Sequence, residues 1–137
     1  MAEYIAMGRS NYFRVTDEER WNELSQGLCG DWTDHEKEID GITHHVLCID
    51  GSLDWVEREG DSAYESNIDY FLDELQKIIP DNECFIYEEI GNEKFRYVVG
   101  VAVCVTKDEI TWINLDALAR KWAEERLGTG YIAKTSC

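Results

Sequence analysis

Three β-rich runs in the second half of the chain follow one another with only short polar separators between them. They cover residues 84–90, 95–105 and 109–113, and the pairs Gly91-Asn92 and Lys107-Asp108 separate them. Strand-like runs joined by such short turn signals are typical of β-hairpins. This part of the chain therefore predicts an antiparallel meander. Its run VVGVAVCV is apolar on both faces and is predicted to be the central strand.

The strongest helix signal covers residues 66–79. Apolar side chains recur there at the i, i+3, i+4, i+7 spacing of one helix face, and these are Ile68, Phe71, Leu72, Leu75, Ile78 and Ile79. Ser66 is the predicted N-cap, with Asp69 placed to return the bond, and Pro80 ends the helix.

Two shorter helices are predicted on either side of this one. Thr16 and Glu19 have the spacing of a capping box, and the apolar face that follows them ends near residues 27–30. The second helix covers residues 115–127, between an Asn114 cap and a Gly128 stop. Its apolar side chains are predicted to face the core, and these are Leu115, Leu118, Ala119 and Trp122.

The remaining segments complete the predicted fold. Residues 4–15 and 42–49 are β-prone, residues 31–41 are either a loop or a solvent-facing edge strand, and residues 52–65 predict a long loop. Helices and strands do not alternate regularly, which disfavours a parallel doubly wound sheet. The sequence predicts one α+β domain over residues 1–137, with a largely antiparallel sheet of about five strands and three helices.

The acidic residues are concentrated in the middle of the chain. The formal net charge is -16, and residues 17–93 hold 23 of the 29 acids with only 4 of the 13 bases. An asymmetry of this kind is typical of a surface that serves an interaction. Proteins bind nucleic acid largely by placing Lys and Arg against its phosphates, which releases the counterions of those phosphates. The negative charge of this chain therefore argues against direct nucleic-acid binding.

We expect the contact to be made by carboxylates from three acidic stretches, at about residues 31–40, 54–65 and 69–73. A basic partner is the class of protein that such a surface attracts. The predicted partner-binding residues are Asp34, Glu36, Glu38, Asp40, Asp54, Glu57, Glu59, Asp61, Glu65, Asp69 and Asp73.

Residues that could hold a metal form one cluster in the sequence. His45-x-x-Cys48 is its close pair, with Cys29, His35 and His44 nearby. Zinc sites usually take two close pairs of ligands, and neighbouring histidines on a strand point to opposite faces. We interpret these residues as ordinary strand residues and expect neither metal nor cofactor, although the pattern leaves a zinc site open.

Signatures of catalysis and of membrane insertion are not found. The sequence has no local arrangement typical of a nucleophile and its base, and no phosphate-binding glycine loop. It also has no run of 18 apolar residues, and residues 1–14 lack the features of a signal peptide. These observations favour a cytoplasmic protein that is not an enzyme, with no membrane partner.

The opening run RSNYFRVTDEE of residues 9–19 is similar to the start of small proteins of mobile elements. Small size, a single α+β domain and strong acidity also resemble the anti-CRISPR proteins of phages that mimic nucleic acid. Those families share no common fold or catalytic residues, so the resemblance implies a mode of action and no particular site. It implies an inhibitor in the host cytoplasm that blocks the basic groove of a partner such as a CRISPR effector.

The alternative is an immunity protein or antitoxin that neutralises a basic toxin. The same acidity would then cover the active site of a nuclease or of a ribosome-directed toxin. The sequence leaves both alternatives open.

Overall fold

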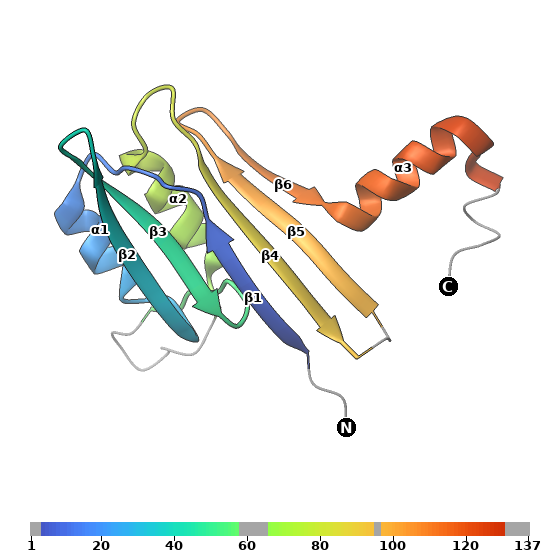
Figure 1. Ribbon diagram of the computed structural model, residues 1–137, viewed down its shortest axis with the longest axis horizontal. Helices are drawn as coiled ribbons and strands as arrows, with labels where there is room; N and C mark the ends of the chain where they lie inside the picture. The colour runs from blue at the N-terminus through green and yellow to red at the C-terminus, as the bar shows by residue number, and fades with distance from the viewer. Residues whose placement is uncertain (1–3, 58–65, 95–96, 131–137) are drawn as a thin grey trace.

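The computed structural model describes residues 4–57, 66–94 and 97–130. Six strands form one antiparallel sheet in the order β2-β3-β1-β4-β5-β6 (Figure 1). The predicted α+β class and antiparallel sheet are confirmed, with six strands where about five were expected. The elements in chain order are β1 (Ile5–Ser10), α1 (Glu18–Ser25), β2 (Asp31–Ile39), β3 (Ile42–Asp50), α2 (Ile68–Ile78), β4 (Phe85–Glu93), β5 (Tyr97–Val105), β6 (Ile110–Asn114) and α3 (Leu115–Leu127).

The sixth strand is β2, which forms one edge of the sheet. It pairs with β3 along its whole length, from Asp31 opposite Asp50 to Ile39 opposite Ile42. Asp40 and Gly41 join the two strands with φ values of 54° and 79°. Positive φ at both positions is the requirement of a type I′ hairpin turn, which Asp-Gly favours. Of the two alternatives for residues 31–41, the edge strand is therefore correct.

Strand β1 lies at the centre of the sheet, between β3 and β4. The first six elements, β1 to β4 with α1 and α2, have the connectivity of the split β-α-β motif, and β5 and β6 extend that sheet. The prediction that residues 98–105 form the central strand is wrong, because crossover connections place β1 there and leave β5 next to the edge. The predicted turn at Gly91-Asn92 is also wrong, since both residues pair with β5 inside β4.

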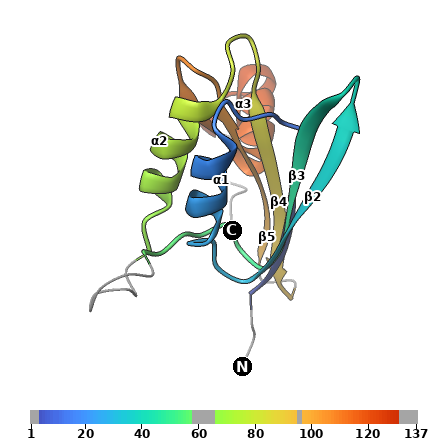
Figure 2. The same ribbon diagram turned by 90° about the vertical axis from the view of Figure 1, so that its left-hand side faces the viewer.

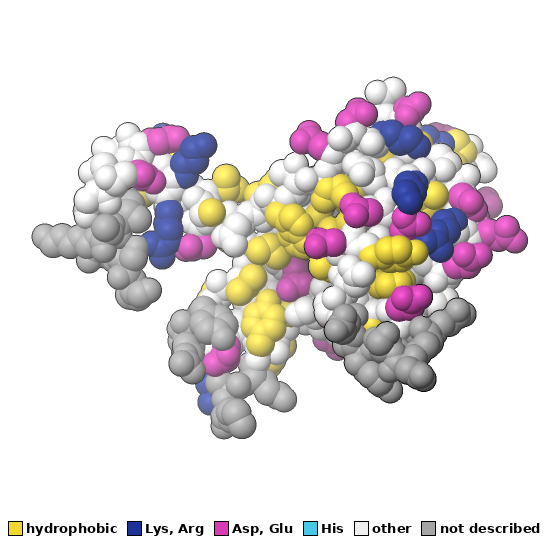
Figure 3. Space-filling view, turned by 180° about the vertical axis from the view of Figure 1, so that it is seen from behind, with side chains coloured by type: hydrophobic (Ala, Val, Ile, Leu, Met, Phe, Trp, Pro, Cys, Tyr) yellow, Lys and Arg dark blue, Asp and Glu magenta, His cyan; other side chains and the backbone are white. Residues whose placement is uncertain are grey.

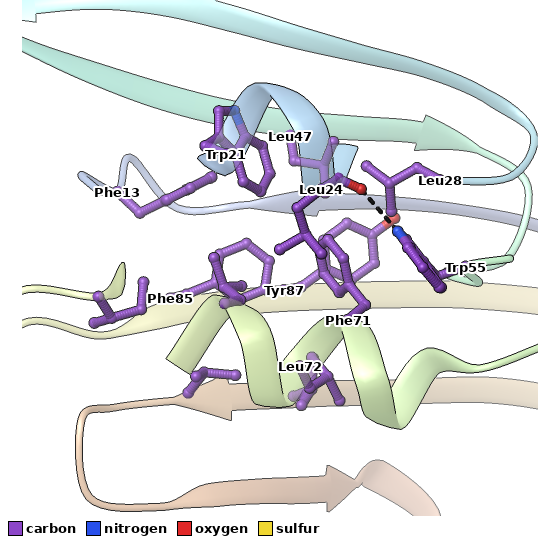
Figure 4. Packing of buried hydrophobic residues seen from close by; sticks show 14 of the residues in the cluster. Phe13, Trp21, Leu24, Leu28, Leu47, Trp55, Phe71, Leu72, Phe85 and Tyr87 are labelled. Atoms are coloured by element: carbon purple, nitrogen blue, oxygen red, sulfur yellow. Dashed lines mark hydrogen bonds between the residues drawn. The ribbon is translucent and has the colours of Figure 1, made fainter. Parts of the chain in front are cut away.

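Helices α1 and α2 lie side by side on one face of the sheet (Figure 2). The core fills the space between them and the strands, and the Trp55 indole Nε1 closes one end by donating to the Leu24 oxygen at 2.7 Å (Figure 4). Burying one large apolar side chain contributes about 1.5–3 kcal/mol. The buried residues with at most 1% exposure include Trp21, Leu24, Leu28, Leu47, Phe71, Leu72, Leu75, Phe85, Tyr87 and Val103.

The helix caps lie close to their predicted positions. Asp17 and Asn67 cap α1 and α2, each one residue after the predicted Thr16 and Ser66. Asp and Asn rank at least as high as Ser and Thr at this position, so two adjacent candidates could not be separated by sequence. The Asn114 cap of α3 is confirmed.

Helix α3 projects from the end of β6 away from the body of the protein (Figure 1). None of its residues is buried. The prediction that Leu115, Leu118, Ala119 and Trp122 face the core is wrong. The helical period predicts which side of α3 is apolar, but within the described part of the chain no element covers that side. Among the described residues, no helix is long and apolar enough to cross a membrane.

Candidate acidic interaction surface

A buried histidine ties the edge strand β2 to helix α1. Alternation along β3 turns the His45 side chain toward the helices, where its exposure is 0%. Its Nδ1 lies 2.9 Å from Oδ1 of Asp34, and its Nε2 lies 2.8 Å from Oε2 of Glu18. Trp21 Nε1 donates a further hydrogen bond of 2.8 Å to Asp34. Two carboxylates from different elements therefore meet on one imidazole ring.

The two carboxylates keep the ring protonated. Burial by itself lowers the pKa of His45, but the hydrogen bonds to Asp34 and Glu18 outweigh it and raise that pKa to about 9. Burial alone would raise the pKa of Asp34, and the hydrogen bonds from His45 and Trp21 hold it below its ordinary value. At neutral pH the ring is therefore an imidazolium that donates from both nitrogens.

The same cluster is the one place among the described residues where three possible metal ligands come together. Ligand atoms of Asp34, Glu36 and His45 lie within 4.8 Å of one another. Both ring nitrogens of His45 already face carboxylate oxygens, Nδ1 at 2.9 Å from Asp34 and Nε2 at 2.8 Å from Glu18. The arrangement fits an internal ion pair that holds β2 against α1.

The predicted close pair His45 and Cys48 does not come together. The two residues are three apart on β3 and lie on opposite faces of the sheet. Cys48 and His35 line a hollow on the face away from the helices, whereas His45 lies beneath α1. The geometry therefore disfavours a zinc site built on His45 and Cys48.

Exposed carboxylates surround this cluster on the helix side of the molecule. Glu36 and Glu38 share the face of β2 that carries Asp34, because strand side chains alternate. Helix α1 lies between β2 and α2 (Figure 2). We define the acidic surface as the exposed Glu18, Glu19 and Glu23 of α1, Glu36 and Glu38 of β2, and Asp69 and Asp73 of α2.

The described bases near the acidic surface already contact carboxylates. The Arg20 guanidinium contacts Glu74 at 2.8 Å and Glu23 at 3.3 Å. Lys77 also pairs with Glu74. Lys37 belongs to β2 but lies on its other face, with its Nζ 5.3 Å from the Tyr12 ring centroid. Within the acidic surface, Glu18 is paired with His45 and Glu23 with Arg20. Among the described residues, its other five carboxylates form no ion pair.

Seen from the helix side, acidic side chains are scattered over the part of the molecule that holds α1 and α2 (Figure 3). A patch of hydrophobic side chains lies between that part and the projecting α3 (Figure 3). The acidic surface thus ends before α3 begins.

The predicted partner-binding residues divide into three groups. Glu36, Glu38, Asp69 and Asp73 belong to the acidic surface, Asp40 is exposed at the hairpin tip, and Glu57 is exposed at the end of its described segment. Asp34 and Asp54 have internal partners: Asp34 binds His45, and Asp54 accepts from Ser66 Oγ and from the backbone N–H of Trp55. Glu59, Asp61 and Glu65 lie outside the described residues.

The acidic residues of α1 were not among the predicted binding residues. Glu18 and Glu19 stand in the first turn, where acidic side chains stabilise the helix dipole. That local role, together with the contact between Glu18 and His45, accounts for them without a binding partner. The signal that could have found them is the run Asp17-Glu18-Glu19 followed by Glu23 one turn later.

Comparison with protein-family models, with curated proteins and with solved structures finds no match to this chain.

Proposed function

We propose that this protein is an inhibitor that occupies the basic nucleic-acid-binding surface of another protein, in the manner of an anti-CRISPR nucleic-acid mimic. The single observation that supports it is the acidic surface itself. Carboxylates from α1, β2 and α2 share one side of the molecule, where Arg20 and Lys77 both pair with Glu74. A basic groove that normally holds phosphates offers such a surface its complementary charge.

The spacing of these carboxylates supports the same proposal. Glu36 and Glu38 are two residues apart on a strand, which separates them by about 7 Å. Glu19 and Glu23, like Asp69 and Asp73, are four residues apart on a helix, which separates them by about 6 Å.

Each of the three rows, on α1, β2 and α2, has one charge per about 6 to 7 Å along its own element. When the three rows are projected on one axis, they supply about one charge per 2 Å. A nucleic-acid duplex has one charge per about 1.7 Å of axis, and each of its strands has one per about 3.4 Å. The charge density of the acidic surface therefore lies between that of a single strand and that of a duplex.

A test requires a variant that reverses this charge without disturbing the core. The exposed positions on β2 and α2 are suitable because their substitution should change stability by no more than about 0.5 kcal/mol each. The surface variant is Glu36→Lys, Glu38→Lys, Asp69→Lys and Asp73→Lys. A control with the same change in net charge, placed at the β5–β6 turn and on α3, is Asp108→Lys, Glu109→Lys, Glu124→Lys and Glu125→Lys.

The assay measures how the chain competes with fluorescein-labelled target DNA for a panel of purified, guide-loaded CRISPR effectors. We expect the wild type to displace DNA from at least one effector, more strongly at 50 mM than at 300 mM NaCl. Four lost pairs at about 0.5 kcal/mol each predict roughly 30-fold weaker inhibition by the surface variant. The control variant should stay within about threefold of the wild type.

Two results would contradict the proposal. One is simultaneous binding of the chain and DNA to the effector at full strength. The other is an equal loss of inhibition in the surface variant and the control, which would show a dependence on net charge alone. A pull-down that instead recovered a basic toxin, with its activity neutralised, would favour the immunity-protein alternative.

A further inference from the structure

Two apolar surfaces of this chain lie uncovered on the side away from α1 and α2. The first is the α3 stripe, made of Leu115, Leu118 and Trp122, which lie on one side of the helix at the i, i+3, i+7 spacing. The second is the open-face groove of the sheet, a hollow of about 590 Å³. Its most exposed apolar side chains are Ile5, Met7, Ile90 and Val98. Each of these seven side chains exposes more than half of its surface.

Strand β5, which contributes to the groove, has the sequence pattern of a strand that is covered on both faces. β5 is apolar along nearly its whole length, a pattern typical of strands buried on both sides. The helices α1 and α2 cover only one of these faces (Figure 2). The other face therefore needs a cover that the described part of the chain does not supply.

Helix α3 begins on this face but does not lie across it. Its first residue, Leu115, packs over Gly100, where the position of a Cβ would be 3.1 Å from Leu115 Cδ2. Leu118 lines a neighbouring hollow together with Ile90 and Ile113. The helix then leaves the sheet (Figure 1), and Trp122 remains 59% exposed. The α3 stripe thus cannot cover the groove of its own chain.

The groove and the α3 stripe are adjacent, because Leu115 belongs to both. Monomers rarely expose contiguous apolar patches of more than a few hundred Å², and larger ones mark interaction sites.

Charge favours a second copy of this chain as the occupant. The acidic surface lies on the helix side, and the groove lies on the other side of the sheet. Helix α3 is itself neutral, with three acids and three bases. Two copies can therefore meet through α3 and the groove without bringing their acidic surfaces together.

The α3 stripe also has the composition of an interface anchor. The Arg126 guanidinium carbon lies 4.0 Å from the Trp122 ring centroid, which holds the indole on this side of the helix. Trp and Arg, with Tyr, are enriched at the energetic centre of protein interfaces.

We propose that this protein forms a symmetric dimer in which the α3 stripe of each copy covers the open-face groove of the other. The contact is isologous and occurs twice around one two-fold axis. It closes both apolar surfaces at once and directs the two acidic surfaces outward. The proposal does not depend on the proposed function.

The test is sedimentation equilibrium of the full chain at 50 μM in 0.5 M NaCl, where repulsion between the acidic copies is screened. We expect a mass of about 32 kDa, twice the 15.9 kDa of one chain. Trp122→Asp on the stripe and Val98→Arg in the groove should each give a monomer. Ile42→Asp, at an apolar position 44% exposed outside both surfaces, should remain dimeric.

A mixture of the two monomeric variants tests the reciprocal contact and shows that both variants are folded. A heterodimer of these variants keeps one contact with a native stripe on a native groove, whereas each homodimer has none. We therefore expect the 1:1 mixture to form dimers. A wild type that is monomeric at 50 μM, a dimer insensitive to either substitution, or a mixture that stays monomeric would overturn the proposal.

Discussion

Replacement of His45 by glutamine should abolish a pH dependence of stability that the wild type shows between pH 6.5 and 9. The wild-type ring is fully buried and donates to Asp34 and Glu18 at 2.9 and 2.8 Å. Glutamine is also polar, but it cannot hold a positive charge between the two carboxylates. The variant therefore loses the charge and keeps a hydrogen-bonding group.

The size of the effect follows from the difference between the folded and unfolded pKa of His45. The folded value is about 9 and the ordinary value is 6.5. Because the folded pKa is the higher one, the folded protein binds the proton more tightly, and the resulting stability is fully present below pH 6.5. It amounts to about 3 kcal/mol and is lost as the pH rises through 9.

The assay is urea unfolding at 25 °C, followed by tryptophan fluorescence, at half-unit steps from pH 6 to 9.5. The free energy of unfolding of the wild type should exceed that of His45→Gln by about 3 kcal/mol at pH 6.5, with most of this difference gone at pH 9. Burial also raises the pKa of the Cys84 thiol, which lowers stability at high pH in both proteins and cancels in the difference.

His44→Gln is the matched control, because it changes the neighbouring histidine, whose Nδ1 lies 2.9 Å from the backbone oxygen of Ile42. Its stability should follow the wild-type pH profile. A difference between wild type and His45→Gln that stays constant within about 0.5 kcal/mol over this range would refute the view that His45 is charged in the folded protein.

Two further predictions concern close packing in the core and are measured by the same urea unfolding. Tyr87→Phe should be neutral or slightly stabilising, because the Tyr87 hydroxyl is buried and has no hydrogen-bond partner among the described residues; a loss above about 1 kcal/mol would contradict this. Gly27→Ala should cost at least about 2 kcal/mol, because the new Cβ would lie 2.2 Å from Trp55 Nε1. Gly41→Ala, at a positive φ of 79° in open space, should cost about 1 kcal/mol, and an equal cost at both glycines would argue against the clash.

Local sequence patterns predicted most of the secondary structure. The periodic run at 66–79 became α2, and residues 115–127 became α3 with their predicted bounds. These elements depend on side-chain period and on capping residues, which are properties of a few neighbouring positions. Where two adjacent residues could cap, as Ser66 and Asn67 could, the sequence did not separate them.

The acidity of the middle segment was also readable from sequence, whereas the state of each carboxylate was not. Asp34 and Glu36 are alike in chemistry and two residues apart on β2. Asp34 is drawn into an ion pair because the chain folds His45 and Trp21 onto it, and Glu36 remains exposed. Which acids are free to meet a partner is therefore decided by long-range contacts.

The sequence by itself determined the fold class, the period of each element and the regional charge, because each of these depends on residues close together in the chain. Tertiary structure alone decided that β1 lies at the centre of the sheet and β5 beside its edge. It also decided that α3 points away from the core with Leu115 and Trp122 exposed. An amphipathic pattern shows which side of an element is apolar, but what covers that side depends on how distant segments pack in space.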